Sequence, residues 1–287
     1  MRGNHHQTAS KLKTMYQKKY QEKLEKTYRE KKVQSKIWND ITEGGKNLDN
    51  FKWTRTNMTP EKVEQIIRIQ EQMIPTRTFL QMQGKHQGTT TCRLCEMHPE
   101  GTLHWMSACP YLAGSEYLKR HNQALKVFYV ALAKQIGLID PKIPWFNTHI
   151  APVIENEVAS IHWNIKMATH TTVEHRWPDL RVEWKKKQLI EVFDMACPLD
   201  CNVTEKEKEK IRDYSQLCYD LRRQNPTQRV VFHPLVIGAT GRLSNIKKEV
   251  NSVIEDTKVT DSIVREMQKT VVVYTQQMIH RILTGLL

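Results

Sequence analysis

Three cysteines and one histidine constrain this chain more than any other feature of its sequence. They follow the spacing C-x2-C-x8-H-x4-C and are Cys92, Cys95, His104 and Cys109. A Cys-x-x-Cys turn directs two thiolates at one face of a tetrahedral zinc ion, and a histidine and a cysteine about one helical turn apart can complete the site from a short helix. The spacing predicts a closed, structural zinc knuckle whose short helix begins near Gly101 and ends at Pro110.

Two histidines are candidates for the third zinc ligand. His98 also lies between the cysteine pairs, but only His104 gives workable geometry with Cys109. The alternative to a zinc site is that all these cysteines are ordinary reduced residues. The remaining cysteines are interpreted as packing residues or surface thiols, because each lies far from a second ligand pair: Cys197, Cys201 and Cys218. Six cysteines so unevenly placed favour a reducing intracellular compartment over a disulfide scaffold.

Charge is the second constraint, and it is unevenly distributed. The 287 residues include 44 Lys and Arg against 31 Asp and Glu, a net charge of +13. Residues 1–40 hold 11 of these bases against four acids. A charge of this size favours a polyanionic partner, so we interpret the segment as a helical or partly ordered arm that follows a phosphate backbone. The alternative is a solvated linker without a dedicated partner.

Two classes of protein are excluded by the distribution of apolar residues. No apolar run approaches the roughly 20 residues that span a bilayer, and the opening sequence MRGNHHQTASKLK has no apolar segment typical of a secretory signal. The first well-marked helix starts at Thr59, which suits the N-cap, with Pro60 at the first helical position. Pro75 is expected to kink or end this helix.

From residue 178 the pattern becomes strand, strand, helix, strand. Residues 180–184 alternate apolar and polar side chains, residues 185–188 form a charged turn, and residues 189–196 read as a more buried strand. With that turn, the residue numbers of each pair of opposed residues in the hairpin sum to 373, and Asp179 therefore lies opposite Asp194. Opposed residues have Cβ atoms about 5 Å apart, and two carboxylates there repel unless a cation lies between them. The register predicts a divalent metal with oxygen ligands.

The strongest predicted helix covers residues 204–224. Lys210 lies one turn before Tyr214, so their side chains share a face. A buried strand at 229–237, a tight loop at 238–241 and two helices at 244–256 and 262–285 follow. The order of elements predicts an α/β (α+β) fold with a small mixed sheet flanked by helices.

These segments resemble a known family. RWPDLRVEW, EVFDMACPLDCNV, EKIRDY and VVFHPLVIGATG resemble the restriction-like endonuclease domain of non-long-terminal-repeat retrotransposon proteins, which belongs to the PD-(D/E)xK nuclease superfamily. The knuckle and the following Arg120-His121-Asn122 resemble the Cys-Cys-His-Cys and RHN motifs of the same proteins. The resemblance covers residues 50–285. Together with the basic N-terminal segment it gives four parts: an arm at 1–58, a helical segment at 59–90, a zinc knuckle at 91–124 and a PD-(D/E)xK core at 125–287.

The resemblance also implies roles for individual residues. Asp179 is the aspartate of the PD pair and Asp194 the second metal-binding acid. Lys210 is the lysine, displaced onto the next helix, and Tyr214 the tyrosine of the family. Together with a Mg²⁺ or Mn²⁺ ion they would hydrolyse a DNA phosphodiester.

Some positions depart from the family pattern. No lysine follows Asp194 two residues on, an absence that related retrotransposon domains share. Trp177 occupies the position that is normally basic, with Arg176 one residue earlier, and Asp213 replaces the lysine before the tyrosine. Glu191 is either a third metal ligand or a tolerated replacement in a strand that should be apolar. Taken singly, Asp179 could be a turn residue, and Asp194 could cap a strand or pair with Arg181.

The implied function is nicking of target DNA to expose a 3′ hydroxyl that primes reverse transcription. No Tyr-x-Asp-Asp sequence occurs, so we expect the polymerase centre in a missing reverse transcriptase portion, with DNA and RNA as partners and the nucleus as the compartment. His121 is either an active-site contributor or a helix-surface residue. The residues expected to contact nucleic acid are Arg120, His121, Arg176, Lys185, Lys186 and Lys187. The rival functions are an inactive nucleic-acid-binding remnant and, more weakly, a bare zinc-binding interaction module.

Overall fold

The computed structural model describes residues 3–31, 34–35, 39, 48–170, 172–254 and 256–287. Its centre is a five-stranded mixed sheet in the order β1-β2-β3-β4-β5. The strands are β1 (Val153–Glu155), β2 (Ala159–Trp163), β3 (Leu180–Trp184), β4 (Leu189–Ala196) and β5 (Arg229–Val236). β1 to β4 pair antiparallel and β4 pairs parallel with β5. The predicted α/β class with a mixed sheet is therefore confirmed.

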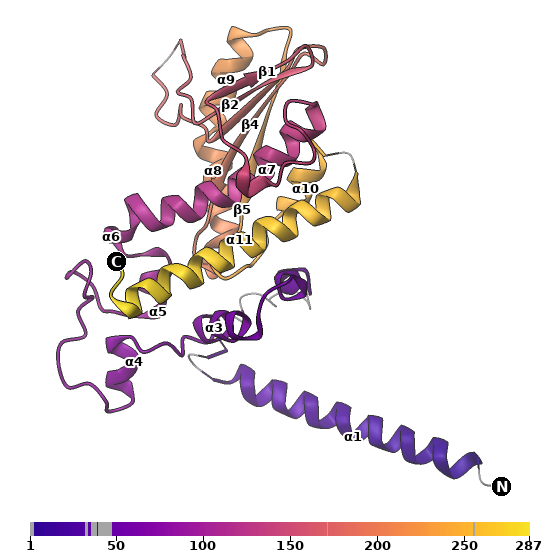
Figure 1. Ribbon diagram of the computed structural model, residues 1–287, viewed down its shortest axis with the longest axis vertical. Helices are drawn as coiled ribbons and strands as arrows, with labels where there is room; N and C mark the ends of the chain where they lie inside the picture. The colour runs from indigo at the N-terminus through magenta and orange to yellow at the C-terminus, as the bar shows by residue number, and fades with distance from the viewer. Residues whose placement is uncertain (1–2, 32–33, 36–38, 40–47, 171, 255) are drawn as a thin grey trace.

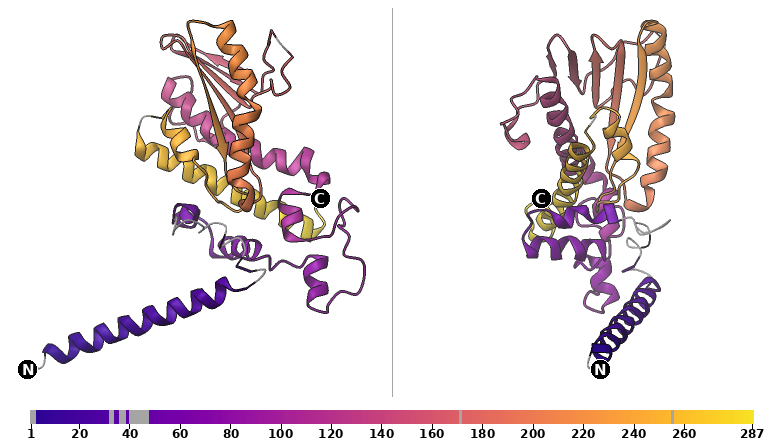
Figure 2. Two further views of the ribbon diagram at one scale, coloured as in Figure 1. Left: turned by 180° about the vertical axis from the view of Figure 1, so that it is seen from behind. Right: turned by 90° about the vertical axis from the view of Figure 1, so that its right-hand side faces the viewer.

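Helices cover both faces of the sheet (Figures 1 and 2). On one face lie α7 (Leu118–Ile136), α10 (Ile246–Asn251) and α11 (Thr257–Thr284), and on the other lie α8 (Val203–Asp213) and α9 (Ser215–Gln224). The short helix η4 (Asp200–Asn202) precedes α8, and η3 (Trp145–Asn147) follows α7. Because β4 and β5 are joined through α8 and α9, they can run parallel.

Strand β4 is buried on both faces, which explains its apolar sequence LIEVFDMA. Phe193 and Met195 pack into the core formed with α7 and α11, while Ile190 and Val192 pack against α9. Each face excludes water from apolar side chains, the main favourable contribution to folding. The two acids of β4, Glu191 and Asp194, are spaced by three residues and therefore project from opposite faces.

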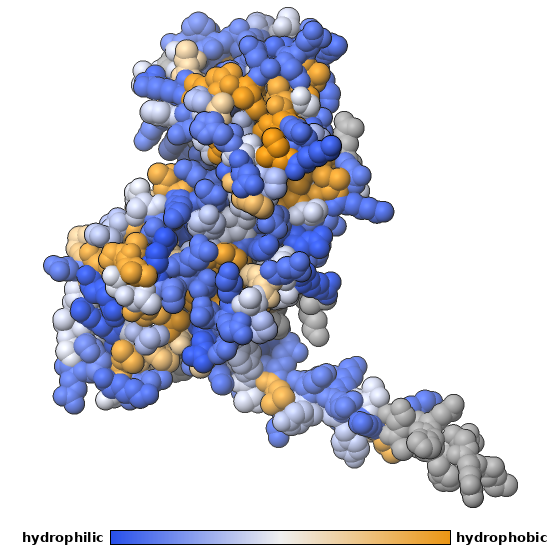
Figure 3. Space-filling view, in the orientation of Figure 1, coloured by the Kyte–Doolittle hydropathy of each residue, from blue (hydrophilic) through white to orange (hydrophobic). Residues whose placement is uncertain are grey.

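The segments before the sheet form a second region. Helix α1 (Gly3–Arg29) projects away from the remaining structure, and its visible surface is mostly hydrophilic (Figures 1 and 3). η1 (Leu48–Arg55), α3 (Pro60–Gln70) and α4 (Arg77–Met82) follow. The knuckle then leads through α5 (Thr102–Ser107), α6 (Pro110–Leu112) and η2 (Ala113–Tyr117) into α7. None of the described helices is long and apolar enough to cross a membrane.

Residues 48–55 pack on the main body although the sequence assigns them to the basic arm. Trp53 is fully buried, and its backbone N–H donates to Oε1 of Gln268 on α11. The sequence also predicts a break in the chain at Gly44-Gly45, and these two residues lie outside the described residues. The division into four segments stays a prediction, and α7 continues without interruption across its boundary after residue 124.

Several element boundaries agree with the sequence and others do not. β3 and β4 match the predicted strands, and Thr59 caps α3 with Pro60 as its first residue. The single helix predicted for 204–224 is wrong, since it is divided at Tyr214. Pro110 does not end the knuckle helix, because α5 ends at Ser107 and Pro110 begins α6. The last two helices are also displaced from their predicted starts, to Ile246 and Thr257.

The tight loop predicted at 238–241 is held by a buried acid that sequence reasoning did not single out. Asp200 accepts hydrogen bonds from the backbone N–H and hydroxyl of Thr240 and from the N–H of Arg242. A Cβ atom at Gly238 would collide with the Asp200 carboxylate. Glycine is needed there so that the loop can approach this carboxylate.

Candidate functional site

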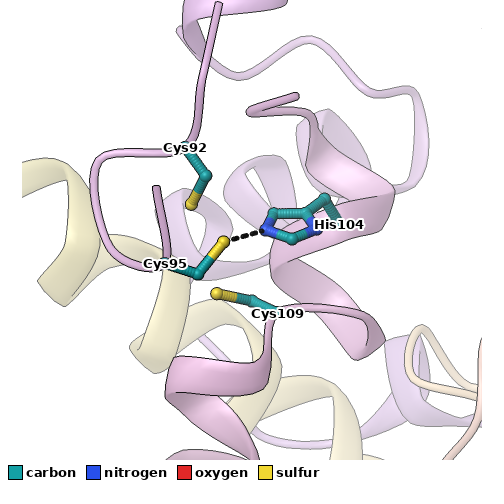
Figure 4. Close-up of side chains that lie close together, drawn as sticks. All are labelled: Cys92, Cys95, His104 and Cys109. Atoms are coloured by element: carbon teal, nitrogen blue, oxygen red, sulfur yellow. Dashed lines mark hydrogen bonds between the residues drawn. The ribbon is translucent and has the colours of Figure 1, made fainter. Parts of the chain in front are cut away.

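The four predicted zinc ligands converge. One ligand atom from each lies within 4.8 Å of the other three, and the residues are Cys92, Cys95, His104 and Cys109. Figure 4 shows the three sulfur atoms and the imidazole facing a common space, with the Cys95 sulfur 3.3 Å from Nε2 of His104. Three sulfurs and one imidazole nitrogen are the donor set of closed structural zinc sites. The group could therefore hold a structural zinc ion, and His104 is the histidine of that group.

Local backbone structure brings the first two cysteines together. An isolated bridge between Thr91 and Pro99 closes a small hairpin, and Glu96 turns the chain with a positive φ of 54°. The N–H of Cys92 donates to the carbonyl of His98, so His98 contributes its backbone to the turn while its side chain stays outside the ligand group. The pairing of the thiols therefore follows from a turn of a few residues.

A buried acid that the sequence did not reveal supports this hairpin. Glu100 is fully buried and accepts hydrogen bonds from the backbone N–H groups of Arg77 and Arg93. The Arg93 guanidinium forms two further bonds to the same carboxylate. These bonds satisfy an acid that would otherwise be costly to bury, and they connect the knuckle to α4.

The thiols lie where a bound cation would change their protonation. Cys92 and Cys109 are fully buried. Burial, together with the charge of Cys92, raises the pKa of Cys109 to about 12. A metal ion favours the thiolate over the thiol when it binds. The knuckle also shares a buried core with Met278, Ile279 and Ile282 of α11, so its geometry is coupled to the main body.

The second predicted cluster lies where β3 begins and β4 ends. Leu180 pairs with Phe193 and Trp184 with Leu189, so paired positions sum to 373 and the predicted register is confirmed. Asp179, the residue before β3, accepts a 2.7 Å hydrogen bond from the N–H of Met195 to Oδ2. The two acids thus come from neighbouring strands at the same end of the hairpin.

Asp194 is the more buried of the two acids. It is 4% exposed, and its Oδ1 accepts a 2.5 Å hydrogen bond from the hydroxyl of Tyr214. Its Oδ2 forms an ion pair with Nζ of Lys210. Burial and the negative charge of Asp179 raise the pKa of Asp194 to about 6, although Lys210 and Tyr214 act in the opposite direction. The structure therefore brings together Asp179, Asp194, Lys210 and Tyr214, as the sequence predicts. We call these four residues the acid cluster.

His121 joins this cluster from α7. Its Nε2 lies 3.0 Å from Oδ2 of Asp179 and 3.0 Å from the carbonyl oxygen of Met195, and its Nδ1 lies 2.9 Å from Oδ1 of Asn122. Both ring nitrogens face acceptors, which suits the doubly protonated imidazolium. Burial alone would lower the pKa of His121, but the hydrogen bond and charge of Asp179 raise it to about 9. Of the two alternatives for His121, the geometry favours a contributor to the cluster.

No family model matches the sequence, and no curated protein matches it. What either cluster can do chemically therefore depends on its donor atoms and their geometry.

The basic residues predicted to contact nucleic acid are dispersed. Arg120 is 2% exposed and donates to the carbonyls of Met106 and Cys197 and to the hydroxyl of Thr275. A direct contact between Arg120 and nucleic acid is therefore contradicted, because its guanidinium is used inside the protein. Arg176 is half-buried in the loop before β3, close in sequence to Asp179.

The lysine turn lies far from the acids. The three exposed side chains follow β3, at the opposite end of the hairpin from Asp179, and belong to Lys185, Lys186 and Lys187. At about 3.4 Å per residue, the intervening strand separates them from Asp179 by about 20 Å. Lys185 forms a 2.9 Å ion pair with Glu155 on β1. Any contact that this turn makes with nucleic acid is remote from the acid cluster.

Glu191 does not complete the acid cluster. Its carboxylate projects from the other face of the sheet, accepts a 2.6 Å hydrogen bond from Nε1 of Trp184 and lies 3.3 Å from Nε2 of His233. The suggestion that Glu191 is a third metal ligand beside Asp194 is therefore wrong. Nor does Asp194 pair with Arg181, whose guanidinium contacts Glu183.

Proposed function

We propose that this chain is the metal-dependent DNA endonuclease portion of a retrotransposon-type protein, with a PD-(D/E)xK-like core. The observation that carries the proposal is the convergence on Asp194. Tyr214 and Lys210 from the following helices contact its carboxylate, and Asp179 lies close enough to raise its pKa. Perturbed acids beside a lysine are typical of functional sites. The resemblance of the sequence to restriction-like endonucleases adds the reaction class.

The donor chemistry fits a magnesium or manganese ion. Carboxylate oxygens are the ligands that Mg²⁺ prefers, and one or two of them suffice because the ion retains several waters. Asp179 and Asp194 are the residues that would hold it. A cation between them would relieve the repulsion that contributes to the raised pKa of Asp194. When bound, such an ion supplies Lewis-acid stabilisation of the phosphate and a water of lowered pKa.

The protein's own groups have distinct roles in this proposal. The Lys210 side chain is 20% exposed, and its ammonium lies beside the buried carboxylate of Asp194. It can therefore stabilise the negative charge that develops on the scissile phosphate. Tyr214 fixes the orientation of the Asp194 carboxylate through its hydroxyl. His121 orients Asp179 in the same way from α7. His121 and Tyr214 are therefore positioning residues.

Nicking of supercoiled plasmid tests this function. Wild type with Mg²⁺ or Mn²⁺ should convert supercoiled to open-circular DNA, and omitting the added ion should abolish conversion while zinc is retained. Asp179→Ala and Asp194→Ala should each lose activity at least about 100-fold, the scale on which single electrostatic contributors to catalysis act. Asp140→Asn is the matched control, since this exposed acid accepts a bond from the N–H of Lys142 in the turn that follows α7, at the opposite end of that helix from His121. Equal activity of all variants would refute the proposal.

The second candidate is a nucleic-acid-binding protein with this fold but no catalysis. One observation favours it: each carboxylate already meets a cationic partner, Lys210 for Asp194 and His121 for Asp179. A charge-balanced cluster has less need for a metal. Both candidates predict salt-dependent DNA binding, because both use the basic surface. Absence of nicking by a folded, zinc-loaded, DNA-binding protein would select the second.

The proposed reaction also specifies partners. A nick with a free 3′ hydroxyl is useful to a retrotransposon only beside a reverse transcriptase, so that polypeptide, its RNA and the target DNA are the partners we propose. The zinc knuckle and the basic helix α1 would hold nucleic acid. A genomic substrate assigns the protein to the nucleus.

A further inference from the structure

An exposed tryptophan lies beside the acid cluster. Trp177 precedes Asp179 by two residues, so their Cα atoms are at most about 7 Å apart. It is 55% exposed, whereas most large aromatic side chains near the sheet are buried. An exposed indole costs the protein the apolar burial that it would gain inside. Its position therefore calls for a reason other than packing.

Hydrogen bonds hold this tryptophan although it is exposed. Its indole Nε1 donates a 2.8 Å bond to the carbonyl of Asn164, and its own carbonyl oxygen lies 3.2 Å from the Tyr214 hydroxyl. The same hydroxyl contacts Asp194, so the backbone of Trp177 is tied to the cluster. The indole has little orientational freedom left to lose when it binds a ligand.

Two backbone hydrogen bonds fix the loop on both sides of Trp177. The N–H of Asn164 donates to the carbonyl of Asp179, and the N–H of Met167 donates to the carbonyl of Arg176, both at 2.8 Å. The chain leaving β2 therefore lies against the chain entering β3, and the loop between them starts and ends at the acid cluster.

The surroundings of the indole are basic. The Lys166 ammonium lies 5.9 Å from the centre of the Trp177 ring, and Arg176 is the adjacent residue. An exposed aromatic ring interleaved with basic side chains is typical of surfaces that bind single-stranded nucleic acid, because bases stack on the ring and cations contact phosphates. Neither an apolar peptide nor a lipid tail would use these charges.

We propose that Trp177 is a stacking platform for one unpaired nucleobase next to the phosphate held at the acid cluster, with Lys166 and Arg176 contacting the adjoining phosphates. The inference rests on the proposed nuclease function for the location of the phosphate. Its ligand class is single-stranded or locally opened DNA.

Binding to abasic oligonucleotides tests the platform without catalysis. Fluorescence anisotropy would measure the affinity of a short single-stranded DNA in buffer without Mg²⁺ or Mn²⁺, with one position at a time made abasic. For wild type, removing the stacked base should weaken binding about 10-fold, and Trp177→Ala should weaken binding of the intact strand by a similar factor. In Trp177→Ala, the abasic change should have no further effect.

The controls separate stacking from folding and from charge. Trp177→Phe retains an aromatic face and should keep most of the affinity. Phe146→Ala removes an aromatic ring that is at least as exposed (62%) and belongs to η3, beyond α7, so this variant should bind as wild type does. Binding of a fully paired duplex should change little in Trp177→Ala, since its bases are already stacked.

The results also distinguish this inference from the proposed function. If wild type and Trp177→Ala respond equally to every abasic position, the platform is refuted even when plasmid nicking succeeds. If the abasic effect disappears only in Trp177→Ala, the platform stands even when no nicking is observed, and the endonuclease proposal alone fails.

Discussion

The zinc-ligand group and the acid cluster are assembled differently. The first draws its four ligands from 18 consecutive residues, 92–109. The second draws side chains from α7, the residue before β3, β4, α8 and the junction between α8 and α9, and each of its carboxylates contacts a cationic side chain. The first is a closed set of four soft donors that could hold a structural zinc ion, whereas the charges of the second are balanced by its own side chains. Metal binding is therefore expected to be structural in the first and conditional in the second.

The largest effect should come from removing zinc. Cys109→Ser replaces a fully buried ligand, and loss of a structural zinc removes on the order of 10 kcal/mol of binding free energy in small zinc domains. Because the knuckle shares its core with α11, we expect loss of bound zinc and a strongly lowered unfolding temperature. Metal analysis of the purified protein and calorimetry measure both.

The control for this change is Cys201→Ser. Cys201 is exposed and lies outside the ligand group, so this variant should retain one zinc per chain and the wild-type unfolding temperature. Zinc-free wild-type protein with an unchanged unfolding temperature would contradict the structural role of the site.

A smaller effect is expected from the buried cluster on the other face of β4. His233 is 3% exposed and lies between Glu249, 2.9 Å from Nδ1, and Glu191, 3.3 Å from Nε2. His233→Leu leaves both carboxylates without this cationic partner. Removing one partner of a buried ion pair costs about 3–5 kcal/mol, and urea unfolding would measure the loss.

The loss of stability in His233→Leu should depend on pH. Burial would lower the pKa of His233, but its bonds to Glu191 and Glu249 raise it above the ordinary value. A raised histidine pKa stabilises the fold fully below about pH 6.5, and the contribution is lost as the pH rises through the raised value. The difference between wild type and His233→Leu should therefore narrow towards alkaline pH. A difference that is constant with pH would show that packing, not charge, accounts for the loss.

The sequence predicted these regions to different extents for a physical reason. The convergence of the Cys3His group and the register of β3 with β4 depend on short spacings and one turn, so the places of Cys92 and Asp194 in the structure could both be predicted. The partners of buried charges depend on packing between elements distant in the chain. Neither the bonds of Glu100 to Arg93 nor those of Glu191 to His233 follow from a local pattern.

The residues that were assigned wrongly also depend on packing between elements that are distant in the chain. Arg120 has the charge of a nucleic-acid contact, and only the packing of α7 against β4 and α11 reveals that its guanidinium is buried. The predicted helix 204–224 has helical periodicity throughout, but it divides at Tyr214, whose hydroxyl is bound to Asp194.

Replacing Asp194 should change the free energy of unfolding in the opposite direction to replacing His233, the partner of Glu191. Because its pKa is raised to about 6, ionised Asp194 lowers the stability of the fold. The folded protein binds a proton at Asp194 more tightly than the unfolded chain does, so the protonated side chain stabilises the fold. This contribution is complete below about pH 4 and is lost as the pH rises through about 6. Asp194→Asn should therefore stabilise the protein by up to about 3 kcal/mol near pH 7.5, while it abolishes nicking.

Urea unfolding of Asp194→Asn beside Asp140→Asn would measure this effect on the free energy of unfolding. A loss of several kcal/mol, as expected for His233→Leu, would identify the Asp194–Lys210 pair as a structural ion pair. It would then favour the non-catalytic candidate.

The smallest effect is expected from the lysine turn, at the end of the hairpin remote from the acids. Replacing Lys185, Lys186 and Lys187 together by alanine removes three exposed cations without touching the cluster. For each phosphate that is no longer neutralised, the slope of log affinity against log salt should fall by about 0.9. We therefore expect a weaker, less salt-dependent affinity for duplex DNA but an unchanged nicking rate at saturating plasmid. A lowered rate at saturation would mean that DNA bound along the hairpin orients the scissile phosphate, and the acid cluster would then extend functionally to both ends of β3.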